Sequence, residues 1–250
     1  MTIFDLLDRV AFLRGVPAVA VVLLAALVAV VAWDVTLRLG RNAAAGADGR
    51  VLSANLLVFP ALFVLYLVGG LLFVDVLDPR LAVVTVIAGF FNALILLITG
   101  WQVNWGRPPR GLTAEELARL KPGRARTFGP LTVTDRALLR LALSAAILVA
   151  VLWLARMPGA LLPGLPDGAD YLEAAVLGLT GLGLVGLAAA SEPLPGGIGL
   201  LIFLQGFALY YTMVDPSLTM VVALVVLQLA VALAASRLAQ VQFAPANALD

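Results

Sequence analysis

Seven runs of mostly apolar residues, each about twenty residues long, constrain the fold of this chain more than any other feature. A helix needs about 20 apolar residues to cross the hydrocarbon core of a bilayer. Backbone groups in lipid must be paired within their own segment, so each run is expected to be an α-helix. The sequence therefore predicts an all-α integral membrane protein with about seven transmembrane helices, at residues 16–36, 52–74, 81–103, 137–157, 170–190, 197–214 and 217–238.

Composition supports this fold class and narrows the chemistry. Hydrophobic residues make up 62% of the chain and charged residues 12%, whereas soluble domains are about one quarter charged. The chain has no cysteine and no histidine, which excludes disulfides, thiolate chemistry, histidine-ligated metals and Ser–His or Cys–His nucleophile pairs. We therefore expect no catalytic residue, no cofactor-binding residue and no metal ligand.

The longest polar interval, residues 106–135, separates the third apolar run from the fourth. Basic connectors stay on the cytoplasmic side of a membrane, so this loop and the C-terminus are expected inside and the N-terminus outside. The loop is expected to contact anionic lipid headgroups, or alternatively to be a docking patch for an acidic cytoplasmic partner. Its cations include Arg107, Arg110, Arg119, Lys121, Arg124 and Arg126.

The chain is expected to form one membrane domain in three parts. Residues 1–105 hold an interfacial N-terminal segment and three spans, residues 106–135 the basic loop with a short helix at 114–120, and residues 136–250 four spans and a short tail. Abundant arginine, alanine and valine with a single lysine indicate a GC-rich prokaryotic genome. The predicted location is the inner, cytoplasmic membrane, with several passes.

An internal similarity links the second and third spans to the sixth and seventh. A glycine precedes an aromatic residue, and an Asp-Pro pair follows, at Gly69 with Asp78-Pro79 and again at Gly206 with Asp215-Pro216. This pattern favours two parallel three-helix units joined by the fourth span, a 3+1+3 plan. The alternative is local chemistry, because aspartate caps helices and proline fits their first turn.

Polar residues at the span centres are amides, with no charged group among them. They are Asn92, Gln205 and Gln228. Hydrogen bonding between helices is one interpretation of these amides. The other is a polar pocket for a neutral or quinone-like ligand, with Tyr210 and Tyr211 assisting.

Carboxylates near the predicted span ends are Asp34, Glu173 and Glu192. Structural or capping roles compete here with participation in an ion path. Unbroken apolar sequence follows Glu173, so this residue is the one expected to be buried.

Glycines in the fifth span lie around the helix rather than on one face. Such a helix is expected to pack closely on more than one side. The residues are Gly178, Gly181, Gly183 and Gly186.

The segment SEPLPGGIGLLIFLQGFALYYTMVDPSL, residues 191–218, resembles the small K-type membrane subunits of complex I and their longer E-type relatives in hydrogenase-4. That family places glutamates within its helices for proton transfer. The matching interiors here offer Gln205 and Gln228, and Glu173 only near a helix end. The resemblance implies a structural relative that lacks the pumping groups.

Three function classes remain open from the sequence. The first is a non-catalytic polytopic subunit of a larger membrane complex of respiratory or energy-converting type. The second is a small-solute transporter with a polar pocket at the membrane midplane, and the third, least favoured, is a membrane-embedded enzyme. Expected partners are the lipid bilayer, anionic headgroups and other membrane subunits, with no nucleic acid.

Overall fold

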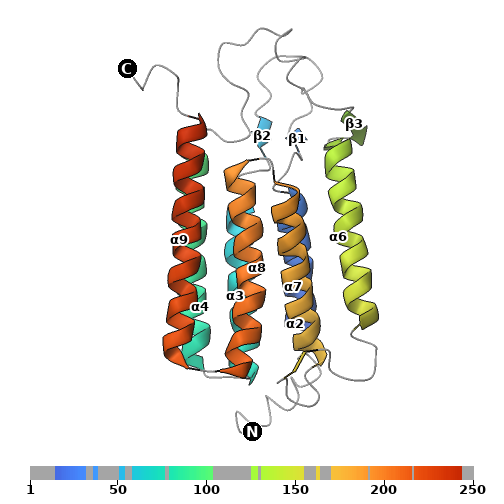
Figure 1. The fold of residues 1–250 in the computed structure, drawn as a ribbon. Helices are drawn as coiled ribbons and strands as arrows, with labels where there is room; N and C mark the ends of the chain where they lie inside the picture. The colour runs from blue at the N-terminus through green and yellow to red at the C-terminus, as the bar shows by residue number, and fades with distance from the viewer. Residues whose placement is uncertain are drawn as a thin grey trace, which may run out of the picture.

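A bundle of helices dominates the structure, a computed structural model that describes residues 15–31, 36–38, 51–53, 58–76, 79–103, 125–128, 131–154, 162–163, 170–190, 192–215 and 217–243 (Figure 1). The predicted interfacial segment at the N-terminus and the predicted helix at 114–120 lie outside these residues. The described part holds seven helices: α2 (Gly15–Val31), α3 (Val58–Val76), α4 (Pro79–Gln102), α6 (Asp135–Leu154), α7 (Asp170–Ala188), α8 (Pro193–Val214) and α9 (Leu218–Phe243).

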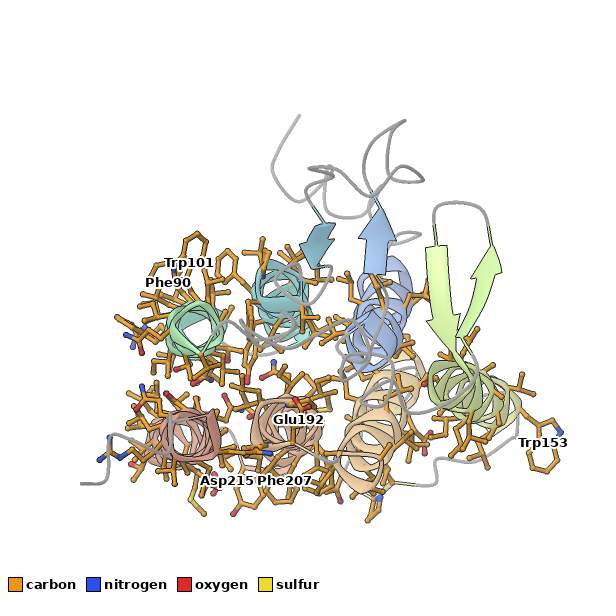
Figure 2. All side chains as sticks on the ribbon, turned by 90° about the horizontal axis from the view of Figure 1, so that it is seen from above. Phe90, Trp101, Trp153, Glu192, Phe207 and Asp215 are labelled. Atoms are coloured by element: carbon orange, nitrogen blue, oxygen red, sulfur yellow. The ribbon has the colours of Figure 1, made fainter. Side chains whose placement is uncertain are left out.

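The helices form two layers with one helix at the side. Helices α2, α3 and α4 make the first layer, and α7, α8 and α9 make the second (Figure 2). Across the layers α2 packs on α7, α3 on α8 and α4 on α9, while α6 contacts α2 and α7. Successive helices alternate in direction, so facing helices run parallel (Figure 1).

A small antiparallel sheet lies at the end of the bundle where α2 ends and where α3 and α6 begin (Figure 1). Its strands pair in the order β2-β1-β4-β3. Strands were not expected from the sequence, because segments of three or four residues are too short to show a periodic pattern. The strands are β1 (Thr36–Arg38), β2 (Val51–Ser53), β3 (Ala125–Phe128) and β4 (Leu131–Thr134).

Four helices are long and apolar enough to cross a membrane, which confirms the prediction of a helical membrane protein at this level. They are Arg80–Gln102, Tyr171–Ala188, Pro193–Val214 and Leu218–Gln242. The bundle also turns large apolar side chains outward, where lipid would cover them. Figure 2 shows four of these pointing away from the bundle: Phe90, Trp101, Trp153 and Phe207.

Glycines allow α7 to pack closely on three neighbours, as its sequence predicts. A Cβ added at Gly178 would press on Val22 of α2, and one at Gly181 would lie 3.1 Å from Ile147 of α6. Toward α8 the backbones themselves meet, since a Cβ at Gly183 would lie 2.6 Å from the Cα of Phe203. Small residues of this kind let membrane helices approach closely.

Candidate functional site

Helix α4 carries three buried polar side chains on one face. Thr85, Asn92 and Thr99 follow one another at intervals of seven residues, or two helical turns, and all are buried. Residues spaced in this way lie above one another on a helix. The buried side of α4 packs on α3 and α9, so these groups must find hydrogen-bond partners inside the protein.

Two of the polar positions on α9 bond directly to α4. The hydroxyl groups of Thr99 and Ser236 form a short buried hydrogen bond, and the Thr99 hydroxyl also donates to the Ile95 carbonyl oxygen at 2.8 Å. One turn further, Gln240 Nε2 donates to Gln102 Oε1 at 3.1 Å. We call this line of polar groups the polar seam: Thr85, Asn92, Thr99 and Gln102 of α4 with Gln228, Ser236 and Gln240 of α9.

Asn92 bonds to α3 instead of α9. Its Nδ2 donates to the hydroxyl of Tyr66 at 3.4 Å, and both side chains are fully buried. Tyr66 fits here because Gly89 has no side chain, since a Cβ at Gly89 would lie 2.8 Å from the ring carbon Cδ1. Among the described residues the Asn92 Oδ1 has no hydrogen-bond partner.

A small cavity lies between α4, α8 and α9 beside the polar seam. The space open to the centre of a water-sized sphere is about 10 Å³, which is close to the room that one water molecule needs. Amide, hydroxyl and aliphatic groups form its wall, and none of them is charged. The wall consists of Thr85, Gln205, Ala208, Thr212, Val221, Leu224, Val225 and Gln228.

Gln205 supplies one of the two amide side chains of this wall. It is 1% exposed, and neither its Oε1 nor its Nε2 has a partner within the described part of the chain. Its Nε2 lies against Gly69 of α3, where an added Cβ would be 3.0 Å away. A buried amide without a hydrogen bond costs free energy. Gln205 is therefore the wall residue that would gain most from a hydrogen-bonding molecule in the cavity.

The predicted pocket residues are thus only partly brought together. Gln205 and Gln228 line one cavity, whereas Asn92 is not among its lining residues. Tyr210 points elsewhere, because its hydroxyl donates to the Pro163 carbonyl oxygen at 3.2 Å. Tyr211 packs its ring on Phe207 of the preceding turn, with ring centroids 5.9 Å apart.

The two predicted carboxylates that the structure describes lie at opposite ends of the bundle. Glu173 is buried, as predicted, and its Oε1 accepts a hydrogen bond from the Leu162 backbone N–H at 2.9 Å. Together with the Tyr210 bond it fastens residues 162–163 to α7 and α8. Glu192 is the half-buried N-cap residue of α8, and its side chain makes no capping hydrogen bond.

Other predicted positions fall outside the described residues. Asp34 and the loop residues Arg107, Arg110, Arg119, Lys121 and Arg124 are among them. Arg126 lies in β3, where its backbone is in register with Val133 of β4, and its side chain is not described.

Sequence reasoning missed the hydroxyl groups of the site: Tyr66, Thr85, Thr99, Thr212 and Ser236. Threonine and serine occur in any membrane helix, so single positions carry no signal. The seven-residue interval of Thr85, Asn92 and Thr99 is a signal that could have found the buried face of α4.

The site offers hydrogen bonds from neutral groups and no charge. Amides and hydroxyls can hold an uncharged polar molecule, but they supply neither a titrating acid–base group nor a nucleophile–base pair. Comparison of the chain with protein-family models, with curated proteins and with solved structures finds no match.

Proposed function

We propose that this chain is a non-catalytic, seven-span subunit of a larger complex in a prokaryotic cytoplasmic membrane. One observation carries the proposal: polar side chains of α4 bond to the neighbouring helices α3 and α9, and the cavity beside them has room for about one water molecule. Thr99 bonds to Ser236, Gln102 to Gln240 and Asn92 to Tyr66. Such bonds hold helices together, which is what a structural membrane subunit needs.

The three helices that are not among the four candidate spans support the seven-span part of the proposal. α2, α3 and α6 have 17, 19 and 20 residues, and each contains a shorter apolar stretch, at Ala18–Val28, Val58–Leu72 and Leu141–Val151. Exposed tryptophans support two interfaces, because Trp101 lies near the end of α4 and Trp153 near the end of α6, and these helices end on opposite sides of the bundle (Figure 1). Membrane proteins enrich tryptophan at these depths.

Carboxylate placement supports a subunit that does not pump ions. Glu173 accepts a hydrogen bond from the Leu162 N–H near the start of α7, and Glu192 is the N-cap residue of α8 at the other end of the bundle. Proton-relaying carboxylates sit within membrane helices and face one another or a water-filled space. The interiors of α8 and α9 instead hold the buried amides Gln205 and Gln228. This agrees with the resemblance to complex I and hydrogenase-4 subunits, which implies a relative without the pumping glutamates.

The layered packing is consistent with a 3+1+3 plan. α2, α3 and α4 face α7, α8 and α9 in the same order and direction. A competing account has support as well, because Asp215 Oδ1 accepts from the Ser217 N–H at 3.1 Å. This bond is the local capping that would produce an Asp-Pro pair without duplication.

Purification from native membranes tests the subunit role. The chain, tagged at its own locus and extracted in mild detergent, is expected to elute with the same partners at fixed stoichiometry and to unfold at lower temperature once they are stripped away. A tagged membrane protein of similar size and span number controls for detergent aggregation. A chain that elutes alone, with unchanged thermal stability, would contradict the proposal.

A small-solute transporter is the second candidate, favoured by the cavity beside Gln205. The cavity as it stands admits one water-sized molecule, so a larger solute requires that α4, α8 and α9 separate. Proteoliposomes that contain the purified chain distinguish the two roles. Saturable uptake of a neutral solute, lost in Gln205→Leu and kept in Gln240→Leu, would favour the transporter.

A further inference from the structure

We propose that the cavity between α4, α8 and α9 is a binding site for one uncharged, hydrogen-bonding molecule of the size of water, held by the Gln205 amide. The site goes beyond the subunit role and does not depend on it. It lies beside the polar seam, four of whose members bond in pairs, Thr99 with Ser236 and Gln102 with Gln240.

Hydrogen-bonding capacity identifies the class of ligand. The Gln205 amide offers two N–H donors and an oxygen with two lone pairs, and both its atoms are without a partner among the described residues. The Thr212 hydroxyl, also in the wall, already donates its proton to the Ala208 carbonyl oxygen at 2.5 Å. Toward the cavity Thr212 can therefore only accept, so the ligand must both donate and accept hydrogen bonds.

The size of the cavity and the lack of charge in its wall narrow the class of ligand further. The cavity volume of about 10 Å³, counted as the space for the centre of a water-sized sphere, admits one water-sized molecule. The eight wall residues include no charged side chain, so an ion would lose its hydration without a compensating charge. Water satisfies all three conditions, because it is neutral, small enough and both donor and acceptor.

The Gln205 amide lies against the backbone of α3. Because Gly69 has no side chain, the Gln205 Nε2 has room beside it; a Cβ added at Gly69 would lie only 3.0 Å from this nitrogen.

Gln228 lines the same cavity from α9. Gln205 lies about 14 Å from the end of α8 at Val214, and Gln228 about 15 Å from the start of α9 at Leu218, at 1.5 Å per residue. The two amides therefore meet the ligand near the middle of the bundle.

Nuclear magnetic resonance on the full chain in nanodiscs, labelled with ¹⁵N only at glutamine, provides the direct test. We expect a nuclear Overhauser effect from water to the side-chain amide protons of Gln205. Gln102, whose side chain is exposed, supplies the positive control for water contact. The Ala208→Val variant narrows the cavity and should abolish the Gln205 signal while it leaves the Gln102 signal. Absence of the Gln205 signal in the unmodified chain would overturn the proposal.

Thermal unfolding gives a second test. The direction in which two variants change the unfolding temperature distinguishes an occupied site from an empty one. If the site holds its ligand, Gln205→Met and Ala208→Val should each lower the unfolding temperature, because groups bonded to the ligand lose it. If the cavity is empty, the first variant removes an unpaired amide and the second fills space, so both should raise it. Ala234→Val, at an exposed position of α9, controls for the helix propensity of valine. A rise for Gln205→Met contradicts the site even if Ala208→Val fails to fold.

Discussion

Thr99 and Ser236, 137 residues apart in the chain, share a hydrogen bond in the buried contact between α4 and α9. Gln102 and Gln240, 138 residues apart, bond close by in the same interface. Asp78 and Asp215, the aspartates of the two Asp-Pro pairs in the sequence, are separated by the same interval as Thr99 and Ser236. Thr99 and Ser236, which follow the two Asp-Pro pairs at the same interval, therefore meet face to face, because α4 and α9 are parallel and start at the same end of the bundle.

The Thr99–Ser236 bond should make a small but measurable contribution to stability. Hydrogen bonds between membrane helices contribute on average about 0.6 kcal/mol in double-mutant cycles. We expect Thr99→Val and Ser236→Ala to show a coupling of about that size when unfolding free energies are measured in mixed micelles. The same cycle on Thr219→Val with Ser236→Ala is the control, because Thr219 is exposed on the first turn of α9. Full additivity of Thr99→Val and Ser236→Ala would show that the bond contributes nothing.

Gly183→Ala should strongly disturb the contact of α7 with α8. The new Cβ would lie 2.6 Å from the Phe203 Cα, and backbone atoms cannot move aside as a flexible side chain can. Overpacking of this kind costs about 1–3 kcal/mol. Gly196→Ala is the matched control, because its Cβ would meet only the Ala190 methyl at 3.4 Å. Equal unfolding temperatures for the two variants would contradict the backbone contact.

Glu173 should act by fastening residues 162–163 rather than by carrying protons. Glu173→Leu removes the acceptor for the Leu162 N–H, and a buried donor left without its partner costs about 1–3 kcal/mol. Glu173→Gln keeps an oxygen there and should cost about 1 kcal/mol. Chemical unfolding of both variants measures the difference. An ion-path role predicts the reverse: intact stability in Glu173→Gln with loss of ion flux.

The orientation of the chain can be tested with one residue, because Lys121 is its single lysine. If the basic loop faces the cytoplasm, an amine reagent that cannot cross membranes should leave Lys121 unlabelled in intact cells. Permeabilised cells should label it fully. Peptide mass spectrometry separates Lys121 from the N-terminal amine. Labelling in intact cells would reverse the proposed orientation.

The apolar runs predicted the helices well. Each of the seven helices overlaps one predicted run, and α7, at Asp170–Ala188, nearly coincides with the run at 170–190. A membrane span needs many apolar residues in succession, so its signal is long and survives errors at the ends. α8 begins at Pro193, four residues before the predicted 197, because prolines and glycines there look like a turn yet fit the first turn of a helix.

The site was harder to predict than the helices. Gln205 and Gln228 were identified because amides are conspicuous among apolar residues, but their shared cavity depends on which helices are neighbours. Sequence order did not reveal that α4 packs on α9 or that Tyr66 takes the Asn92 bond. Burial of Glu173 was predictable, because apolar sequence follows it without a break.

The close approach of α7 to α8 limits how this bundle can move. At Gly183 and Gly199 the two backbones leave no room for a side chain, since a Cβ at Gly199 would lie 2.5 Å from the Leu187 nitrogen. Sliding or rotating either helix would drive side chains into that contact, so the pair must shift as one rigid body. α4 and α9 meet partly through glutamine and hydroxyl side chains that can exchange partners. Any movement within this bundle would therefore keep α7 and α8 together and open the contact between α4 and α9.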